Sequence, residues 1–252
     1  MIKIGLQLYT LREETSRDFV GTLRKVAALG YQGVEFAGYG GLTAEEMKSL
    51  LDELNLVSIG AHVGIERLRD HLDEEIEYHK VLGTKYIACP WLGDEYRESV
   101  VKLMEVTKVL KEASARLAQH GIELGYHNHD FEFTNQFGGK TMFDTIFELT
   151  APAPLFAELD VCWVHFGGYD PSEYMMKYAG RAPLIHLKDV RQNEDGSPQT
   201  VILGEGDMDL DEVVKTAKLT GVEWFIVEQD VCQIDPIESI TQSMAWVRNN
   251  VK

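Results

Sequence analysis

The segment 125–133, GYHNHDFEF, places two histidines, an asparagine and two acidic residues directly after a short apolar run. Similar polar groups end three later apolar runs, at 158–160, 186–189 and 228–230. Imidazoles and carboxylates are the side chains that hold divalent cations and move protons. The sequence therefore indicates metal or acid–base chemistry, provided that the fold brings the ends of these runs together.

The elements that would do this follow one repeated pattern, in which a helical segment is followed by a glycine and a short apolar strand. The pattern occurs at 27–36, 80–89, 118–126 and 218–227. Glycine suits the left-handed position that ends a helix. Helix starts are marked by a capping box at 43–46 and by Asp-Pro pairs at 170–171 and 235–236.

Eight short strands are predicted, each mostly continuous in its apolar residues, as parallel strands with both faces covered should be. They are expected at about 2–9, 33–36, 57–62, 84–89, 121–127, 155–160, 183–188 and 223–228. Alternation of eight strands with helices, and no linker between halves, predicts a single-domain (β/α)₈ TIM barrel over residues 1–252. A doubly wound open sheet is the alternative, but the first strand–helix turn at 9–13 carries no GxGxxG.

In a barrel of this kind, chemistry gathers at the carboxyl ends of the strands. The fifth to eighth predicted strands each deliver an imidazole or a carboxylate to that rim. Burying several such groups without partners costs several kcal/mol for each ion. A divalent cation would resolve this, because nitrogen and oxygen ligands from neighbouring strands can converge on it.

A simpler interpretation applies to each residue alone, since a single histidine or aspartate at a strand end usually caps a turn. Asp189 is a candidate for such a cap, and Glu123 and Glu223 are expected to face solvent. The histidines in helical segments are expected at the surface; they are His71, His79 and His120. Trp163 is equally consistent with the core and with the site.

Several motifs resemble the sugar phosphate isomerase/epimerase superfamily, which has a xylose isomerase-like TIM barrel. They are GLQLYTLRE, VEFAG, IACPWLG, GYHNHDFEF, AELDVCWVHFGG, PLIHLKDV, LGEGDMD and FIVEQD. The likeness runs through essentially the whole chain in the same order. It is specific for fold and superfamily, and less so for substrate.

The resemblance implies one divalent metal ion, Mn²⁺ first and Mg²⁺, Co²⁺ or Zn²⁺ as alternatives. Asp160, His186 and Glu228 match the family's aspartate, histidine and final glutamate. The first ligand departs from the family pattern, because His127 stands where a glutamate belongs. A histidine there resembles the inosose dehydratase branch, while Glu132 is an alternative source of the missing carboxylate.

The leading expectation is an isomerase or epimerase of a small keto-sugar, which moves a proton next to a carbonyl through a metal-stabilised enediolate. Glu228 would exchange the proton, Lys188 would steady the oxyanion, and Glu132 would be the second carboxylate. The loop 204–207 could let the backbone approach an unphosphorylated substrate. Residues expected to contact the sugar are Tyr9, His62, Trp91, Asn128, Trp163 and His165.

Three other functions remain open. A lyase that removes water would need an acid beside the leaving hydroxyl, which His127 or His129 could supply. A phosphodiesterase like the apurinic endonucleases shares the barrel, but the net charge of −17 argues against nucleic-acid binding. A sugar-binding protein without activity is the third.

The remaining features concern location and assembly. No apolar run approaches the ~18–20 residues of a membrane span, and the start MIKIGLQLYTLREE is not a signal peptide. Three isolated cysteines, Cys89, Cys162 and Cys232, predict reduced thiols in a cytoplasmic protein. The lack of a long apolar run and the net charge of −17 predict neither a membrane nor a nucleic-acid partner. Aromatic residues near 163–178 could form a homodimer or homotetramer interface, or pack on the barrel.

Overall fold

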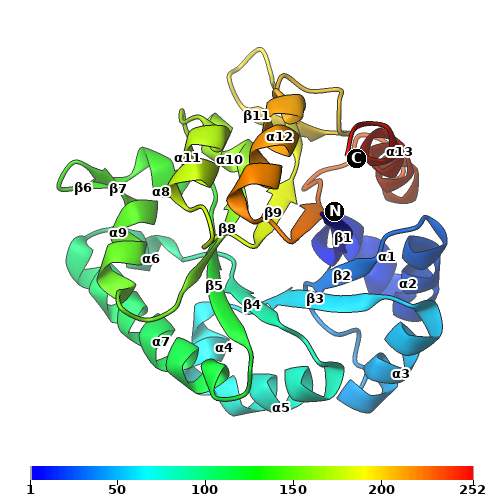
Figure 1. Ribbon diagram of the computed structural model, residues 1–252, viewed down its shortest axis with the longest axis horizontal. Helices are drawn as coiled ribbons and strands as arrows, with labels where there is room; N and C mark the ends of the chain where they lie inside the picture. Colours follow the sequence, from blue (N-terminus) through cyan, green and yellow to red (C-terminus); the bar gives the residue numbers. More distant parts are fainter. Residues whose placement is uncertain (1, 252) are drawn as a thin grey trace.

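The computed structural model describes residues 2–251, which form a closed parallel barrel of eight strands inside a ring of helices (Figure 1). The barrel strands are β1 (Lys3–Gln7), β2 (Gly33–Phe36), β3 (Val57–His62), β4 (Tyr86–Cys89), β5 (Glu123–His127), β8 (Phe156–Asp160), β9 (Leu184–Leu187) and β12 (Trp224–Val227). Their order around the barrel is β1-β12-β9-β8-β5-β4-β3-β2. The predicted single-domain (β/α)₈ barrel is confirmed.

The helices lie outside the strands in chain order, so the colours in Figure 1 run once around the barrel. They are η1 (Leu8–Leu11), α1 (Arg12–Arg17), α2 (Phe19–Ala28), α3 (Ala44–Leu54), α4 (Ile65–Asp70), α5 (Leu72–Leu82), α6 (Asp94–Arg97), α7 (Val100–Ala118), α8 (Phe131–Thr134), α9 (Met142–Thr150), α10 (Val161–Phe166), α11 (Pro171–Lys177), α12 (Leu210–Thr220) and α13 (Pro236–Asn250). The last helix, α13, packs next to the start of the chain: Tyr31 Oη, in the loop after α2, donates to the Ile240 carbonyl at 2.8 Å. Within residues 2–251, none of these helices is both long and apolar enough to cross a membrane.

The eight predicted strands all exist, and most of their bounds shift by no more than two residues. The first strand ends earlier than predicted, because Gln7 accepts a hydrogen bond from the Tyr9 amide and starts the 3₁₀ turn η1. The sequence missed two hairpins, β6 (Gln136–Phe137) with β7 (Lys140–Thr141) and β10 (Asp189–Gln192) with β11 (Pro198–Val201). The predicted capping box at Thr43 and the two Asp-Pro helix starts are confirmed.

The lumen of the barrel changes from apolar to polar along the strands. Every second residue of a strand shares a face, and on three strands the series are Phe156-Glu158-Asp160, Leu184-His186-Lys188 and Trp224-Ile226-Glu228. Their apolar members form a buried cluster with Ile59, Tyr86 and Ala88, separate from the larger core that includes the inward faces of the helices. The polar members therefore gather at the carboxyl end.

One expectation about the outer layer is wrong, and one of two alternatives for its aromatic residues is favoured. His79 is fully buried, with its ring nitrogens 2.9 Å from Tyr39 Oη and from Thr84 Oγ1. Tyr174 and Tyr178 are also buried, and both hydroxyls donate to Asp144. These tyrosines pack on the barrel instead of offering an interface, so an oligomer stays a prediction without support from them.

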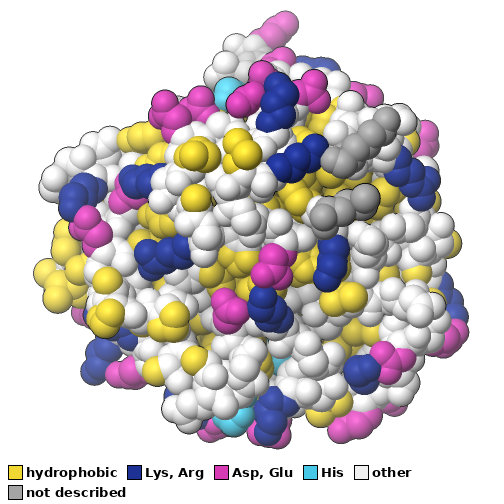
Figure 2. Space-filling model, in the orientation of Figure 1, with side chains coloured by type: hydrophobic (Ala, Val, Ile, Leu, Met, Phe, Trp, Pro, Cys, Tyr) yellow, Lys and Arg dark blue, Asp and Glu magenta, His cyan; other side chains and the backbone are white. Residues whose placement is uncertain are grey.

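On the face shown in Figure 2, acidic and basic side chains are interspersed, with apolar side chains exposed between them. Many of the surface charges are paired along helices, as in Lys80–Glu77 and Lys102–Glu105. The excess of acidic residues therefore does not gather into one block on this face.

Candidate active site

Four side chains from four adjacent strands meet at the carboxyl end of the barrel. Each of His127, Asp160, His186 and Glu228 offers an atom within 4.8 Å of the others. All four are buried. This is the set that the sequence resemblance indicated, and the barrel brings it together although the residues span about a hundred positions.

Asp160 is held by its position at the start of a helix. Its Oδ1 caps α10 by accepting hydrogen bonds from the amides of Cys162 and Trp163 at 3.0 and 3.1 Å. Asn128 bonds the Asp160 backbone in both directions, with its amide donating to the carbonyl and accepting from the N–H. The second carboxylate oxygen, Oδ2, is thereby fixed toward the lumen.

Lys188 lies among the carboxylates of this rim. Its Nζ is 2.9 Å from Asp160 Oδ2, 2.8 Å from Glu228 Oε2 and 3.0 Å from Asp230 Oδ1. Burial lowers the pKa of Lys188, but the three carboxylates outweigh this and raise it well above its usual value. The lysine is therefore a permanent cation that partly compensates the rim.

Below the rim lies a second layer, made by Glu35, His62 and Glu158. His62 Nε2 lies 2.7 Å from Glu158 Oε2, and His186 Nε2 lies 2.7 Å from Glu35 Oε2, both within hydrogen-bond distance. Both bonds join strands that are three places apart around the barrel, so they cross the lumen. Gly60 makes room for this layer, because a Cβ there would lie 3.0 Å from Glu35 Oε1.

Each layer contains one carboxyl group whose pKa is raised and one whose pKa is lowered. Burial raises the pKa of Asp160 to about 6 and, together with the charge of Glu35, that of Glu158 to about 7. Burial acts in the same direction on Glu35, but His62 and His186 overcome it and lower the pKa of Glu35 to about 2. The charges of Lys188 and His186 likewise hold the pKa of Glu228 below its usual value, against burial.

The rim opens into a cavity of about 640 Å³, large enough for a small sugar. The cavity is lined by His62, His127, His129, Lys188, Glu228 and Asp230. The mouth is aromatic and is lined by Tyr9, Trp91 and Trp163 together with Arg12. Burial and the nearby lysine lower the pKa of His129 to about 3, which keeps its ring neutral.

The donor set fits a divalent cation. Two imidazoles and two carboxylates are ligands that Mn²⁺ and Zn²⁺ accept. Asp160 Oδ2 makes no well-aligned hydrogen bond, although Lys188 is 2.9 Å away, and His127 Nδ1 has no hydrogen-bond partner among the described residues. Three carboxylates, Asp160, Glu228 and Asp230, contact Lys188, and two more, Glu35 and Glu158, lie in the layer below. The carboxylates therefore outnumber the one lysine, which leaves negative charge for a cation to compensate.

Three residues that the sequence assigned to the site lie elsewhere. Glu132 is buried and accepts hydrogen bonds from Tyr126 Oη and the His129 amide, so it cannot swing in as the missing carboxylate. His165 is exposed and borders a separate hollow with Val190 and Asp207.

Asn128 is the third: both ends of its amide are used by the Asp160 backbone, and the side chain is fully buried. The loop 204–207 does not offer its backbone amides to a substrate, because those of Gly204 and Gly206 already donate to Asp189 Oδ2 at 2.9 Å. Asp189 is therefore a turn cap, as the simpler interpretation predicted.

Sequence reasoning missed the inner carboxylates. Glu158 lies at the end of a predicted strand but is assigned no function from the sequence. It stands two residues before Asp160, so the two side chains must lie on the same face of the strand. Glu35 had no such signal: the register of β2 against β3 shifts between Val34 and Glu35, and such bulges re-aim side chains in ways that alternation does not predict.

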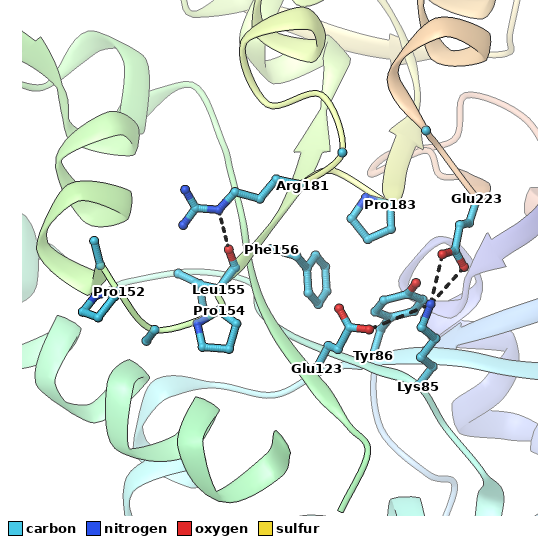
Figure 3. Close-up of a pocket in the computed structure, with 14 residues that line it drawn as sticks. Lys85, Tyr86, Glu123, Pro152, Pro154, Leu155, Phe156, Arg181, Pro183 and Glu223 are labelled. Atoms are coloured by element: carbon cyan, nitrogen blue, oxygen red, sulfur yellow. Dashed lines mark hydrogen bonds and ion pairs between the residues drawn. The ribbon is translucent and has the colours of Figure 1, made fainter. Parts of the chain in front are cut away.

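A second hollow, of about 520 Å³, lies at the opposite end of the barrel (Figure 3). Lys85 forms ion pairs there with Glu223 at 3.0 Å and Glu123 at 3.9 Å, and Arg181 Nε donates to the Leu155 carbonyl. Both glutamates are exposed, as predicted. The part of the chain that the structure describes places neither a histidine nor a group of candidate metal ligands in this hollow.

Residues 23–250 match the family described as xylose isomerase-like TIM barrel, and the chain belongs to that family. An inosose dehydratase from Geobacillus kaustophilus is 28% identical over 248 aligned residues, which cover 82% of this chain and 79% of that protein.

Solved structures agree on the fold. A sugar phosphate isomerase/epimerase from Parabacteroides distasonis superposes with a TM-score of 0.85 at 24% identity, and the match covers all of both chains. A probable 3-DHS dehydratase from Bacillus anthracis superposes with a TM-score of 0.77 at 15% identity, also over both whole chains. The relatives thus include isomerases and lyases.

Proposed function

We propose that this protein is a divalent-metal-dependent enzyme that removes water from a small keto-polyol or keto-sugar. The observation that carries the proposal is the distribution of carboxylates around the cavity. Among residues 2–251, the only carboxylates that line it are Glu228 and Asp230, which belong to the same strand end. The opposite wall carries imidazoles, from His62, His127 and His129.

The cation would be held by His127, Asp160, His186 and Glu228, with Mn²⁺ as the first candidate. When bound, it supplies Lewis-acid polarisation of the substrate carbonyl. Glu228 takes the proton from the carbon next to that carbonyl. Lys188, 2.8 Å from Glu228 Oε2, provides positive charge beside the developing oxyanion.

Elimination then needs an acid on the far side of the cavity from Glu228. The carbon–oxygen bond breaks, and the hydroxyl leaves as water with a proton from an imidazole. His62 suits this role, because Glu35 and Glu158 raise its pKa, although burial opposes them, and favour the protonated ring. His129, which is held neutral, is the weaker donor and suits a hydrogen bond to a substrate hydroxyl.

Isomerisation or epimerisation, which the sequence ranked first, is the second candidate and keeps the same metal and the same Glu228. It requires a second base that returns or removes a proton on the other face of the substrate. Glu132 is not available for this, and a histidine would have to replace the family's glutamate. The sugar phosphate isomerase/epimerase neighbours support this candidate.

A nuclease has less support, because the cavity mouth is aromatic and carries one arginine rather than a basic surface. A small carbohydrate fits the mouth better, since Tyr9, Trp91 and Trp163 offer apolar faces to sugar C–H groups. The two cations of the cavity, Arg12 and Lys188, do not form a phosphate cradle, and Lys188 is already paired with carboxylates. An unphosphorylated substrate is therefore proposed.

The experiment is a panel of inososes and keto-sugars incubated in D₂O with protein stripped by a chelator and with the same protein reloaded with Mn²⁺. After removal of protein and metal, NMR would read the products. The proposal expects a new enone or diketone only in the reloaded sample, and its loss in Glu228→Gln. Deuterium at carbon without loss of water would favour the isomerase, and no change with any compound would reject the substrate class.

A further inference from the structure

The two histidines of the rim set each stand between two layers of carboxylates. His186 Nδ1 is 2.7 Å from Glu228 Oε2 on the rim, while its Nε2 is 2.7 Å from Glu35 Oε2 below. His127 Nε2 is 4.0 Å from Asp160 Oδ2 on the rim, while its Nδ1 is 3.4 Å from Glu158 Oε2 below. Each ring therefore turns one nitrogen to the rim and one to the inner layer.

The inner carboxylates are built to stay in place. Glu35 is fully buried, and its Oε2 also accepts a hydrogen bond from Gln7 Nε2 at 2.8 Å. Glu158 is fully buried, and its Oε2 accepts from His62 Nε2 at 2.7 Å. Neither lines the cavity, so neither is placed to touch substrate.

We propose that Glu35 and Glu158 are positioning residues: Glu35 holds the proton of His186 on Nε2 through a hydrogen bond, and the charge of Glu158 favours that of His127 on Nδ1, so that the rim nitrogens are left free to bind the cation. The contact between His127 Nδ1 and Glu158 Oε2, at 3.4 Å, is not a hydrogen bond and acts through charge alone. The inference rests on the proposed function, because it presupposes that cation. A ring nitrogen can donate its electron pair to a metal only when its proton is on the other nitrogen. Glu35 would then set both the tautomer and the angle of the His186 ring, and Glu158 the tautomer of His127.

A second cation in the inner layer is the competing interpretation. His62, His127, Glu158 and His186 also offer atoms within 4.8 Å of one another. Two ions would have to share His127 and His186 through both nitrogens of each ring, which requires both rings to lose all their nitrogen protons. One ion with two supporting carboxylates needs no such step, so the geometry favours the positioning role.

The test starts from metal-free protein titrated with Mn²⁺ by calorimetry. Wild type should bind one ion per chain, and Glu35→Gln and Glu158→Gln should each bind it about 10- to 100-fold more weakly with the same stoichiometry. Glu75→Gln is the matched control, because Glu75 is an equally buried glutamate bonded to Tyr39 outside the barrel, and its affinity should equal that of wild type.

A second measurement needs no variant. In the Zn²⁺-loaded wild type, long-range ¹H–¹⁵N spectra should show the proton of His186 on Nε2 and that of His127 on Nδ1. Unchanged affinity in both variants, the opposite tautomers, or two ions per chain would each overturn the positioning role while leaving a metal enzyme intact. A wild type that binds no Mn²⁺ would overturn the proposed function together with this inference.

Discussion

Both ends of the barrel carry charged side chains around a lysine, but they differ in how far these side chains are exposed to water. At the amino end, Lys85 pairs with Glu123 and Glu223, and all three side chains are about half exposed (Figure 3). At the carboxyl end, the charged groups around Lys188 are almost fully buried, and acids outnumber bases. Water screens the first set, whereas the second depends on protein partners and a ligand.

The comparison shows that different residues of one barrel stabilise the fold and form the candidate active site. The apolar cluster of Phe156, Leu184, Trp224 and Ile226 fills the lumen between the two ends. The lumen-facing residues on these strands change from apolar to polar within two or three positions. The free-energy cost of burying polar side chains is therefore confined to the carboxyl end. Substitutions at the two ends should therefore differ in size and in what they change.

The largest effect is expected for Asp160→Asn. Asparagine keeps an oxygen that can cap α10, but it removes the charge at the oxygen that faces the other rim ligands. Mn²⁺ affinity should fall by at least about 100-fold, more than the loss of a supporting partner would cause. Metal content and calorimetry would measure this, and retention of wild-type affinity would remove Asp160 from the ligand set.

Lys188→Met should destabilise the metal-free protein but leave it able to bind Mn²⁺. Without the ammonium, Asp160 and Glu228 lose their buried counter-charge, and the metal-free protein should lose about 3–5 kcal/mol of unfolding free energy. Added Mn²⁺ should restore much of this, so the metal-induced rise in Tm should exceed that of wild type, while turnover stays low. An equal rise in both proteins would contradict the shared use of these carboxylates.

Glu132→Gln should change the pH dependence of stability without changing the metal site, because Glu132 is buried near that site but does not line the cavity. Burial raises the pKa of Glu132 to about 8, although Tyr126 and the His129 amide act against this. The folded state therefore binds a proton more tightly than the unfolded chain, so this group's contribution to stability is present below pH 4.5 and is lost as the pH rises to about 8.

The loss can reach about 1.4 kcal/mol per pH unit within that window. Glutamine is neutral at every pH, so the stability of Glu132→Gln relative to wild type should improve from pH 5 to pH 8 in urea unfolding. Mn²⁺ affinity should not change. A constant difference between the two proteins across this range would mean that Glu132 is ionised in the fold.

The smallest effect is expected at the amino end. Lys85→Met removes ion pairs whose members are about half exposed, and such pairs contribute about 0–1 kcal/mol. Unfolding in urea should show a change of that size, and both Mn²⁺ affinity and turnover should equal those of wild type. A loss of turnover would show that the hollow in Figure 3 matters for function.

The sequence predicted the barrel and the meeting of His127, Asp160, His186 and Glu228, because strand ends of a parallel barrel share one rim. It could not predict which neighbouring polar side chains lie outside the candidate metal site. Glu132 follows the fifth strand closely, yet a one-turn helix aims it at Tyr126.

The inner layer depends on contacts across the lumen, which no local pattern records. The bond between His186 and Glu35 joins residues 151 positions apart, and it exists because β2 shifts its register at Glu35 and Gly60 leaves space beside it. His79 shows the same limit outside the barrel, since its helical position gave no sign of Tyr39 and Thr84 as partners.

The most direct test of the central claim is a crystal structure of the protein soaked in Mn²⁺, with an anomalous difference map recorded near the manganese edge. The account predicts one strong peak per chain, within bonding distance of His127, Asp160, His186 and Glu228. A peak among His62, Glu158 and the lower ring nitrogens would contradict it, and so would a map without a peak in the barrel at saturating Mn²⁺.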